Sequence, residues 1–235
     1  MFDLSVNFTF KLGGDRLPEI DEQYQKMYLF AKLVKAYTPI ESWFLTANKK
    51  ADALLHNAFS ESGVRGEAIT RAKALDTESD FRALGVWNGV EGRRGASIST
   101  IYRIPGLGSL RYQASGFDEL KSYVAVAEVV DRALQLCPAS LVEVGPFKYF
   151  SQKQVFPDRP GVGWMLYLPR RIEIGQVPEA RMLRHVTDLN GCEGTIIVSE
   201  IDDGFSADDV DDVKIANQIE IRLADQDLLP KYRDL

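Results

Sequence analysis

The sequence predicts an α+β protein in which mixed or antiparallel sheets are flanked by several helices. Residues 1–10 alternate between apolar and polar side chains, which is the period of a β-strand. Residues 19–37 and 116–137 instead repeat apolar side chains at helical spacing. Strand-type segments also follow one another in groups between the helices, and this order favours an α+β fold over repeated βαβ units.

The N-terminal strand is expected to have one face in contact with solvent. Its apolar side chains, from Phe2 to Phe10, fall on one side of the strand, and polar side chains such as Ser5 and Thr9 fall on the other. This alternation is typical of an antiparallel sheet that covers a core on one face only.

Three helical segments are expected after this strand. The first covers 19–37 and is stopped by Pro39. Asn48 is a suitable N-cap for a short helix that carries the apolar residues of 51–58, and a third helical segment covers 65–75.

The middle of the chain is predicted to form an antiparallel meander followed by a helix. The meander strands are 81–87, 96–104 and 110–112, because glycine and proline turns separate these β-type runs. An amphipathic helix then begins at about 116 and ends at Cys137 before Pro138.

The last part of the chain is predicted to add four strands and one helix. The strands cover 141–144, 163–168, 182–186 and 195–199. The helix covers 206–224, with Ser206 as the N-cap and Asp209 at the third helical position in a capping box. We expect a single domain, 1–235, or two lobes that share a sheet, with a hinge in the proline- and glycine-rich segment 156–163.

Composition describes a folded, mildly acidic protein. The 235 residues carry 34 Asp and Glu against 28 Lys and Arg, a formal charge of -6, and 45% of them are hydrophobic, so disordered and coiled-coil classes are excluded. No apolar run is long enough to span a membrane, and the N-terminus lacks the pattern of a signal peptide. We expect a cytoplasmic protein without membrane contact. Its two cysteines, Cys137 and Cys192, do not have metal-binding spacing, and no cofactor is expected.

No motif in the chain predicts catalysis. His56 and His185 are the only histidines, and we expect a structural role for the first and a solvent-facing position for the second. Glu119-Leu120-Lys121 matches the acidic-x-Lys pattern of restriction-type nucleases. It falls at a helix N-terminus, however, where such residues are common. We therefore expect a protein that is not an enzyme. A carboxylate-based site, formed by a pair such as Glu173 and Asp188, stays open as an alternative, as does a small-molecule or regulatory binding module.

The most skewed feature is the charge of the C-terminal part. Residues 200–235 contain eleven carboxylates and four cations, a net charge of -7, so the remaining residues sum to +1. Seven carboxylates fall within 200–212, here called the acidic segment: Glu200, Asp202, Asp203, Asp208, Asp209, Asp211 and Asp212. A helix cap and the helix dipole account for two or three of them. The segment is either a negative surface for a basic partner or a solvated face.

Several short stretches, taken in order, resemble the immunity protein 52 family of bacterial polymorphic toxin systems. They are WFLT at 43–46, ADALLHNAF at 51–59, LGVWNG at 84–89, GWMLYLP at 163–169, the strand at 194–198, Ala216-Asn217 and Leu228-Leu229-Pro230. The resemblance covers most of the chain. It implies an α+β protein without catalytic residues that binds a cognate nuclease toxin of restriction-endonuclease fold, commonly delivered by a type VI secretion system.

Charge complementarity connects this resemblance to the acidic segment. A nuclease presents a cationic groove for nucleic acid, and an acidic surface fits such a groove. The same charge predicts no direct binding to DNA or RNA, which needs clustered cations. If the acidic segment is not the contact, the turn at 88–94 is the next candidate. The most recognisable residues of this resemblance are three tryptophans, Trp43, Trp87 and Trp164. We expect them to pack in the core.

Overall fold

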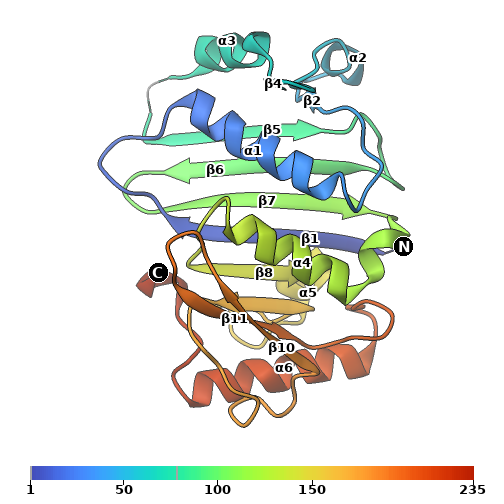
Figure 1. The fold of residues 1–235 in the computed structure, drawn as a ribbon, viewed down its shortest axis with the longest axis vertical. Coiled ribbons are helices and arrows are strands. Elements are labelled where there is room, and N and C mark those ends of the chain that lie inside the picture. The colour runs from blue at the N-terminus through green and yellow to red at the C-terminus, as the bar shows by residue number, and fades with distance from the viewer. Residues whose placement is uncertain (1, 78) are drawn as a thin grey trace.

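A nine-stranded antiparallel sheet organises the chain, with the N-terminal strand in its middle (Figure 1). The computed structural model describes residues 2–77 and 79–235. The strands are β1 (Asp3–Lys11), β2 (Phe44–Leu45), β3 (Phe59–Ser60), β4 (Gly63–Val64), β5 (Phe81–Trp87), β6 (Ala96–Arg103), β7 (Leu107–Ser115), β8 (Leu141–Gly145), β9 (Met165–Leu168), β10 (Met182–Thr187) and β11 (Glu193–Val198). Their order in the sheet is β10-β11-β9-β8-β1-β7-β6-β5-β2, and β3 and β4 form a separate hairpin. The predicted fold class is confirmed.

The described residues also form six helices and two short 3-10 helices. They are α1 (Ile20–Val34), α2 (Lys50–Ala53), α3 (Gly66–Leu75), η1 (Asp118–Lys121), α4 (Tyr123–Leu134), α5 (Phe147–Gln152), α6 (Val210–Asp225) and η2 (Tyr232–Asp234). None of the helices in the described residues combines the length and the apolarity needed to cross a bilayer.

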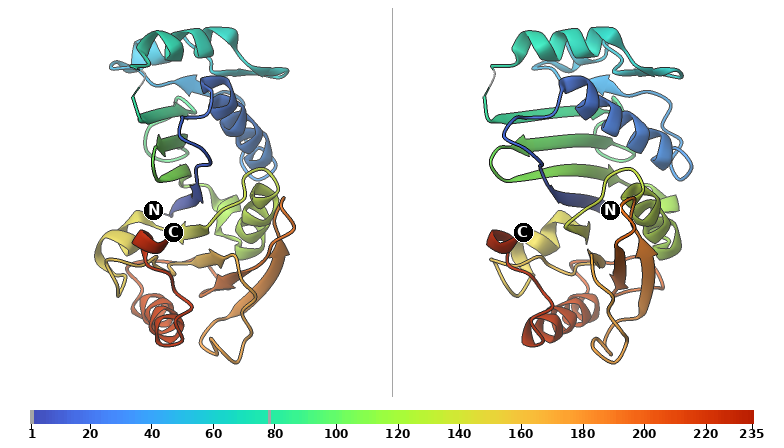
Figure 2. Two further views of the ribbon diagram at one scale, coloured as in Figure 1. Left: turned by 90° about the vertical axis from the view of Figure 1, so that its left-hand side faces the viewer. Right: turned by 60° about the vertical axis from the view of Figure 1, so that its left-hand side comes forward.

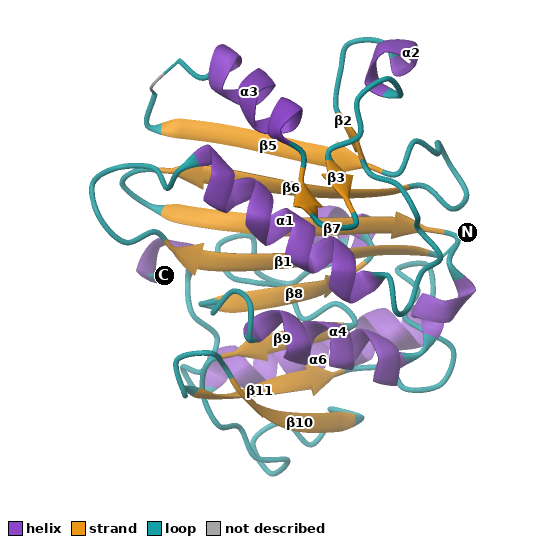
Figure 3. Cartoon of the chain, turned by 45° about the horizontal axis from the view of Figure 1, so that its top comes forward, coloured by secondary structure: helices purple, strands orange, loops and turns teal. Residues whose placement is uncertain are grey.

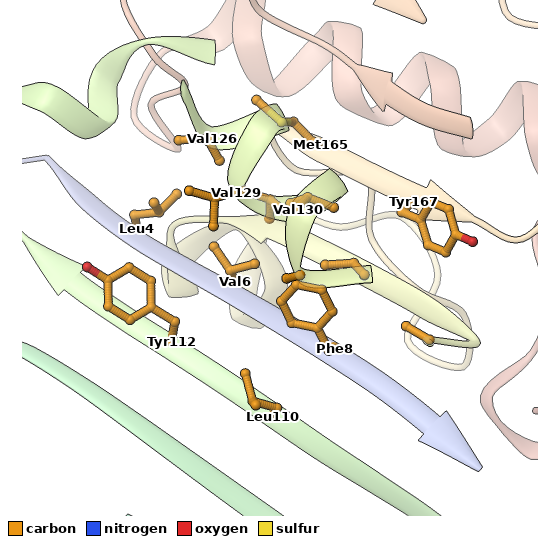
Figure 4. Close-up of a cluster of buried hydrophobic side chains, with 14 of the residues drawn as sticks. Leu4, Val6, Phe8, Leu110, Tyr112, Val126, Val129, Val130, Met165 and Tyr167 are labelled. Atoms are coloured by element: carbon orange, nitrogen blue, oxygen red, sulfur yellow. The ribbon is translucent and has the colours of Figure 1, made fainter. Parts of the chain in front are cut away.

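One face of the sheet, here called the helix face, is covered by α1 and α4 (Figure 2). The apolar side chains of β1 lie on this face, and Figure 4 shows Val6 and Phe8 beneath Val126, Val129 and Val130 of α4. All five side chains are at most 2% exposed. Burying each of them stabilises the fold by roughly 1.5–3 kcal/mol relative to exposure, before the entropy cost of ordering it. The core therefore lies between α1, α4 and the helix face.

The opposite face of the sheet is covered over only half of its width. There α5, α6 and the C-terminal residues lie behind β8, β9 and β11, as Figure 3 shows from a second direction. Across β5, β6 and β7 no described element covers this face. The side chains of β6 alternate accordingly, buried on the helix face and partly or fully exposed on the other. We call this uncovered half, including the adjoining side of β1, the open face.

The expectation of a solvent-facing side on the first strand is wrong for part of β1. Ser5 is 8% exposed and Thr9 is 9% exposed, and Met1 lies outside the described residues. These small side chains are buried because β1 is a central strand, paired with β7 and β8, and α5 packs beside it.

Several predicted element boundaries need correction. Asn48 does not cap the short helix, which follows Lys49 and has only four residues. The helix predicted from about 116 is divided, because 118–121 form η1 and Ser122 then caps α4 by accepting a hydrogen bond from the amide of Ala125. The helix α1 ends at Val34, before the predicted end at 37, and α5 and the β3–β4 hairpin were not predicted.

Two buried carboxyls hold the segment that precedes β9 against the sheet. Glu143 on β8 accepts hydrogen bonds from the Gly161 amide (3.2 Å) and the Tyr232 hydroxyl (2.8 Å). Glu220 on α6 accepts one from the next amide, Val162 (2.9 Å). Consecutive amides of the segment 156–163 are therefore tied to two different elements.

Glu220 also accepts hydrogen bonds from two groups that precede this segment in the chain. Its Oε2 accepts a hydrogen bond from the Val155 amide (2.7 Å), and its Oε1 lies 2.5 Å from the Tyr149 hydroxyl. Burial raises the pKa of Glu220 because it disfavours the charged form, and the nearby Glu143 acts in the same direction. Burial likewise raises the pKa of Glu143.

The first testable prediction concerns Glu220→Gln. Because the folded state binds the Glu220 proton more tightly than the unfolded chain, wild-type stability falls as the pH rises above about 4.3, the ordinary pKa of glutamate. Glutamine stays neutral but turns an NH₂ group towards the Val155 amide, which costs about 1 kcal/mol. Urea unfolding measures the free energy of unfolding of both proteins. The variant should be less stable than wild type by the largest amount near pH 5, and this difference should be smaller at pH 8.

The matched control is Glu61→Gln, at an exposed carboxylate, which should leave the free energy of unfolding nearly unchanged at both pH values. A Glu220→Gln deficit that grows towards pH 8 would contradict the account, since it would mean that the fold favours the charged carboxylate.

Candidate functional site

A groove of about 590 Å³ lies at one end of the open face. Its floor includes Ser5 of β1, Ser97 of β6 and Gln113 of β7, which the strand pairing places side by side. One wall is the turn between β5 and β6, and the other is the start of α5, where Phe147 lies. The groove thus has a polar floor built on rigid strands.

The walls of the groove expose apolar side chains to solvent. Phe147 is 65% exposed and Val90 is 43% exposed. Trp87, which also lines the groove, is partly exposed, whereas Trp43 and Trp164 are 5% and 0% exposed. The prediction of core packing is therefore confirmed for those two tryptophans and only partly for Trp87. Exposed apolar side chains that gather on one surface often mark a protein-binding site.

Hydrogen bonds from Asn88 hold the turn between β5 and β6 in one shape. Its Nδ2 donates to the Arg94 carbonyl (2.7 Å), and its Oδ1 accepts from the Ala96 amide (2.9 Å). The turn is also close-packed, since a Cβ at Gly95 would lie 2.8 Å from the Val90 carbonyl oxygen. This wall, which overlaps the second predicted interface at 88–94, is consequently preformed.

The acidic segment borders the same groove. Lys148, in the wall formed by α5, makes an ion pair with Asp208, and this pair lowers the pKa of the Asp208 carboxyl. Gly204 of the segment lies against Phe2, just before β1. The structure thereby brings both predicted interface segments to one end of the molecule.

Structural roles account for four of the seven carboxylates. Asp208 pairs with Lys148, and Glu200 accepts hydrogen bonds from the amides that follow it. Asp209 is the N-cap of α6 and accepts hydrogen bonds from two amides of its first turn. Asp212 accepts one from the Ser206 amide (2.7 Å), and burial and the neighbouring carboxylates raise the pKa of Asp212.

The predicted capping box at Ser206 is therefore wrong. Ser206 lies three residues before the cap, and its hydroxyl accepts a hydrogen bond from the Asp208 amide instead (3.2 Å). The helix starts at Val210, after Asp209, because the Asp209 carboxylate reaches the free amides of the first turn.

The three remaining carboxylates are here called the free carboxylates: Asp202, Asp203 and Asp211. Each is exposed, and within the described residues the side chain of none of them makes a hydrogen bond or an ion pair. They project negative charge that no cation of this chain neutralises at contact distance.

The other residues singled out in the sequence lie in separate local contacts. His56 pairs with Glu67 (2.7 Å) in a mostly buried position, and His185 is exposed, as predicted for both. Glu173 pairs with Arg171, while Asp188 accepts amide hydrogen bonds within its own turn. In the part of the chain that the structure describes, no three His, Cys, Asp or Glu side chains are grouped to hold a metal ion.

Phe147 is the site residue that sequence reasoning missed. The available signal was Pro146, which ends the buried β8 and starts a new segment at a favourable position for a helix N-terminus. The exposure of Phe147 could not be predicted from the sequence, because the six residues of α5 are too few to show a helical period.

The second prediction separates the roles of these carboxylates. Asp209→Ala removes the cap of α6 and should lower the free energy of unfolding by about 1 kcal/mol. Asp203→Ala removes the same charge without a hydrogen bond and should change it by less than about 0.5 kcal/mol. Chemical unfolding of both variants makes the comparison, and equal losses would show that Asp209 has no special role.

No protein-family model matches the chain, and no curated protein matches it. Among solved structures, the Pseudomonas aeruginosa T6SS protein PA0821 has a similar fold, with a TM-score of 0.55 and 11% sequence identity over 95% of this chain and 76% of that chain. At this identity the similarity concerns the fold alone. The resemblance to the immunity protein 52 family therefore stays a prediction, and what the comparisons show is an α+β fold similar to that of a T6SS protein.

Proposed function

We propose that this protein is an immunity protein that binds and neutralises a cognate nuclease toxin of a type VI secretion system. The observation that carries the proposal is the groove on the open face, which has exposed apolar walls. The acidic segment, here also called the acidic rim, reaches this groove through the ion pair of Asp208 with Lys148. The structural similarity to a T6SS protein supports the same secretion system, and the family resemblance supports the immunity role.

The two parts of the site contribute in different ways. The free carboxylates act at long range, because their field attracts a cationic surface and raises the rate of encounter. Phe147, Val90 and Trp87 act at contact, since large side chains that lose their exposure in an interface supply much of the binding energy. A nuclease offers the matching partner, a cationic surface shaped for nucleic acid.

Neutralisation by binding requires no chemistry from this chain. The protein would act in the cytoplasm, where an incoming nuclease meets nucleic acid, and would bind the toxin rather than DNA or RNA. Of the two alternatives left open by the sequence, the carboxylate-based site has less support, because Glu173 and Asp188 are engaged in local contacts.

The third prediction tests the acidic rim. The variant Asp202→Asn/Asp203→Asn/Asp211→Asn removes three charges whose side chains make no hydrogen bond or ion pair within the described residues, so the protein should still fold. Association with the toxin encoded beside this protein should be roughly tenfold slower at low salt, and the rate should depend less on ionic strength. Stopped-flow kinetics at several salt concentrations measure both effects.

The matched control is Asp15→Asn/Glu19→Gln/Asp225→Asn, which removes the same charge from exposed positions away from the groove. Its association rate should stay close to that of wild type. Equal slowing by both variants would show that the net charge of the protein, and not the position of the free carboxylates, sets the association rate. Absence of any complex with the toxin would refute the proposed function itself.

A further inference from the structure

The open face extends well beyond the groove as a regular grid of side chains. Strand pairing places Asn7, Arg111, Ser99 and Gly85 in one row across β1, β7, β6 and β5. Nearer the other end of the strands, Lys11 is paired with Leu107 and Arg103 is paired with Phe81. The next row along the strands from Arg111 contains Thr9, Ser109, Ile101 and Ala83. Arg103 is exposed and Arg111 is partly exposed.

Positive charge predominates on this face away from the groove. Strands β5, β6 and β7 contain no acidic residue, and the one acid of β1, Asp3, accepts a hydrogen bond from the Ser115 hydroxyl (2.6 Å). On the neighbouring β8, Glu143 is buried and already bound by Tyr232 and Gly161. The open face is therefore cationic, although the protein as a whole is acidic.

Arg103 and Arg111 differ from the arginines elsewhere in the sheet. Arg82 on the helix face of β5 pairs with Asp76 (2.6 Å), and Arg184 on β10 pairs with Asp131 (2.5 Å). Within the described residues no carboxylate oxygen lies within 4.0 Å of the Arg103 or Arg111 guanidinium. Two guanidinium forks on a rigid surface are suited to bidentate recognition of carboxylates.

The arrangement favours an acidic protein surface over nucleic acid. Four residues along a strand separate the rows of Arg103 and Arg111 by roughly 13 Å. Two or three dispersed cations release few counterions and give weak affinity for a phosphate backbone. The acidic segment at the end of the same surface would repel nucleic acid, whereas a protein partner is able to match both signs.

We propose that the open face binds a carboxylate-bearing surface of the same partner whose basic surface meets the acidic segment, with Arg103 and Arg111 forming the ion pairs. This inference rests on the proposed function. A metal-dependent nuclease combines both chemistries, because carboxylates that hold its metal ion lie within the cationic surface that holds the phosphates. The acidic rim and the cationic face would then fit two adjacent regions of one partner.

The fourth prediction tests this inference with Arg103→Gln/Arg111→Gln. Both side chains are on the solvent side of the sheet, so thermal unfolding should be unchanged. The dissociation constant for the neighbouring toxin should rise at least tenfold. The matched control is Arg170→Gln/Arg181→Gln, two exposed arginines without ion pairs in the described residues, which should change it less than twofold.

A second measurement does not depend on removing either arginine. Ser99→p-benzoylphenylalanine places a photo-crosslinker in the middle of the open face, beside Arg111. Irradiation of the complex should join position 99 to the toxin, at a peptide that contains Asp or Glu.

The outcomes separate the two proposals. A stable complex with unchanged affinity in the arginine variant and no crosslink from position 99 would overturn the inference and leave the immunity function intact. Absence of any complex would overturn both. Loss of binding to a generic RNA or DNA duplex, with toxin affinity unchanged, would also overturn the inference, because the face would then be a nucleic-acid surface.

Discussion

The double pairing of β1 is the constraint on which the rest of the structure depends. The N-terminal strand pairs along its whole length with β7 and along half of it with β8, so it joins a meander on one side to the C-terminal strands on the other. The alternation of β1 then fixes both faces of the sheet. Its apolar side chains require the cover of α1 and α4, and its polar side chains continue into the open face.

This constraint also explains why the site lies where it does. The groove needs Ser5, Gln113, Ser97 and Trp87 in one row, and only the registers of β1, β7, β6 and β5 provide that row. The acidic segment approaches the same end of the sheet because Trp164, just before β9, donates a hydrogen bond to the Glu200 carbonyl (2.8 Å). The floor of the groove thus rests on paired strands, which favours association without a large ordering cost.

Local pattern predicted much of the fold and little of the site. Period-two alternation gave β1 and helical spacing gave α1, because each segment is long enough to show its period. The glycine and proline turns that bound it gave β6. The cap of α6 was misplaced, since Ser206 and Asp209 are both good N-cap residues and the sequence does not show which amides are free. The open face could not be predicted, because polar residues such as Ser97 and Ser99 occur on the solvent side of many strands. The sequence does not show that no helix covers this side of the sheet.

The central claim is that partner binding uses the open face and its groove. Hydroxyl-radical footprinting of the free protein and of its complex with the toxin measures side-chain accessibility on both ends of the molecule. The account predicts that modification of Phe147 and Trp87 falls in the complex, while Leu55 and Leu75, which are 74% and 82% exposed on other elements, stay as reactive as before. Protection of Leu55 and Leu75, with Phe147 and Trp87 unchanged, would contradict it.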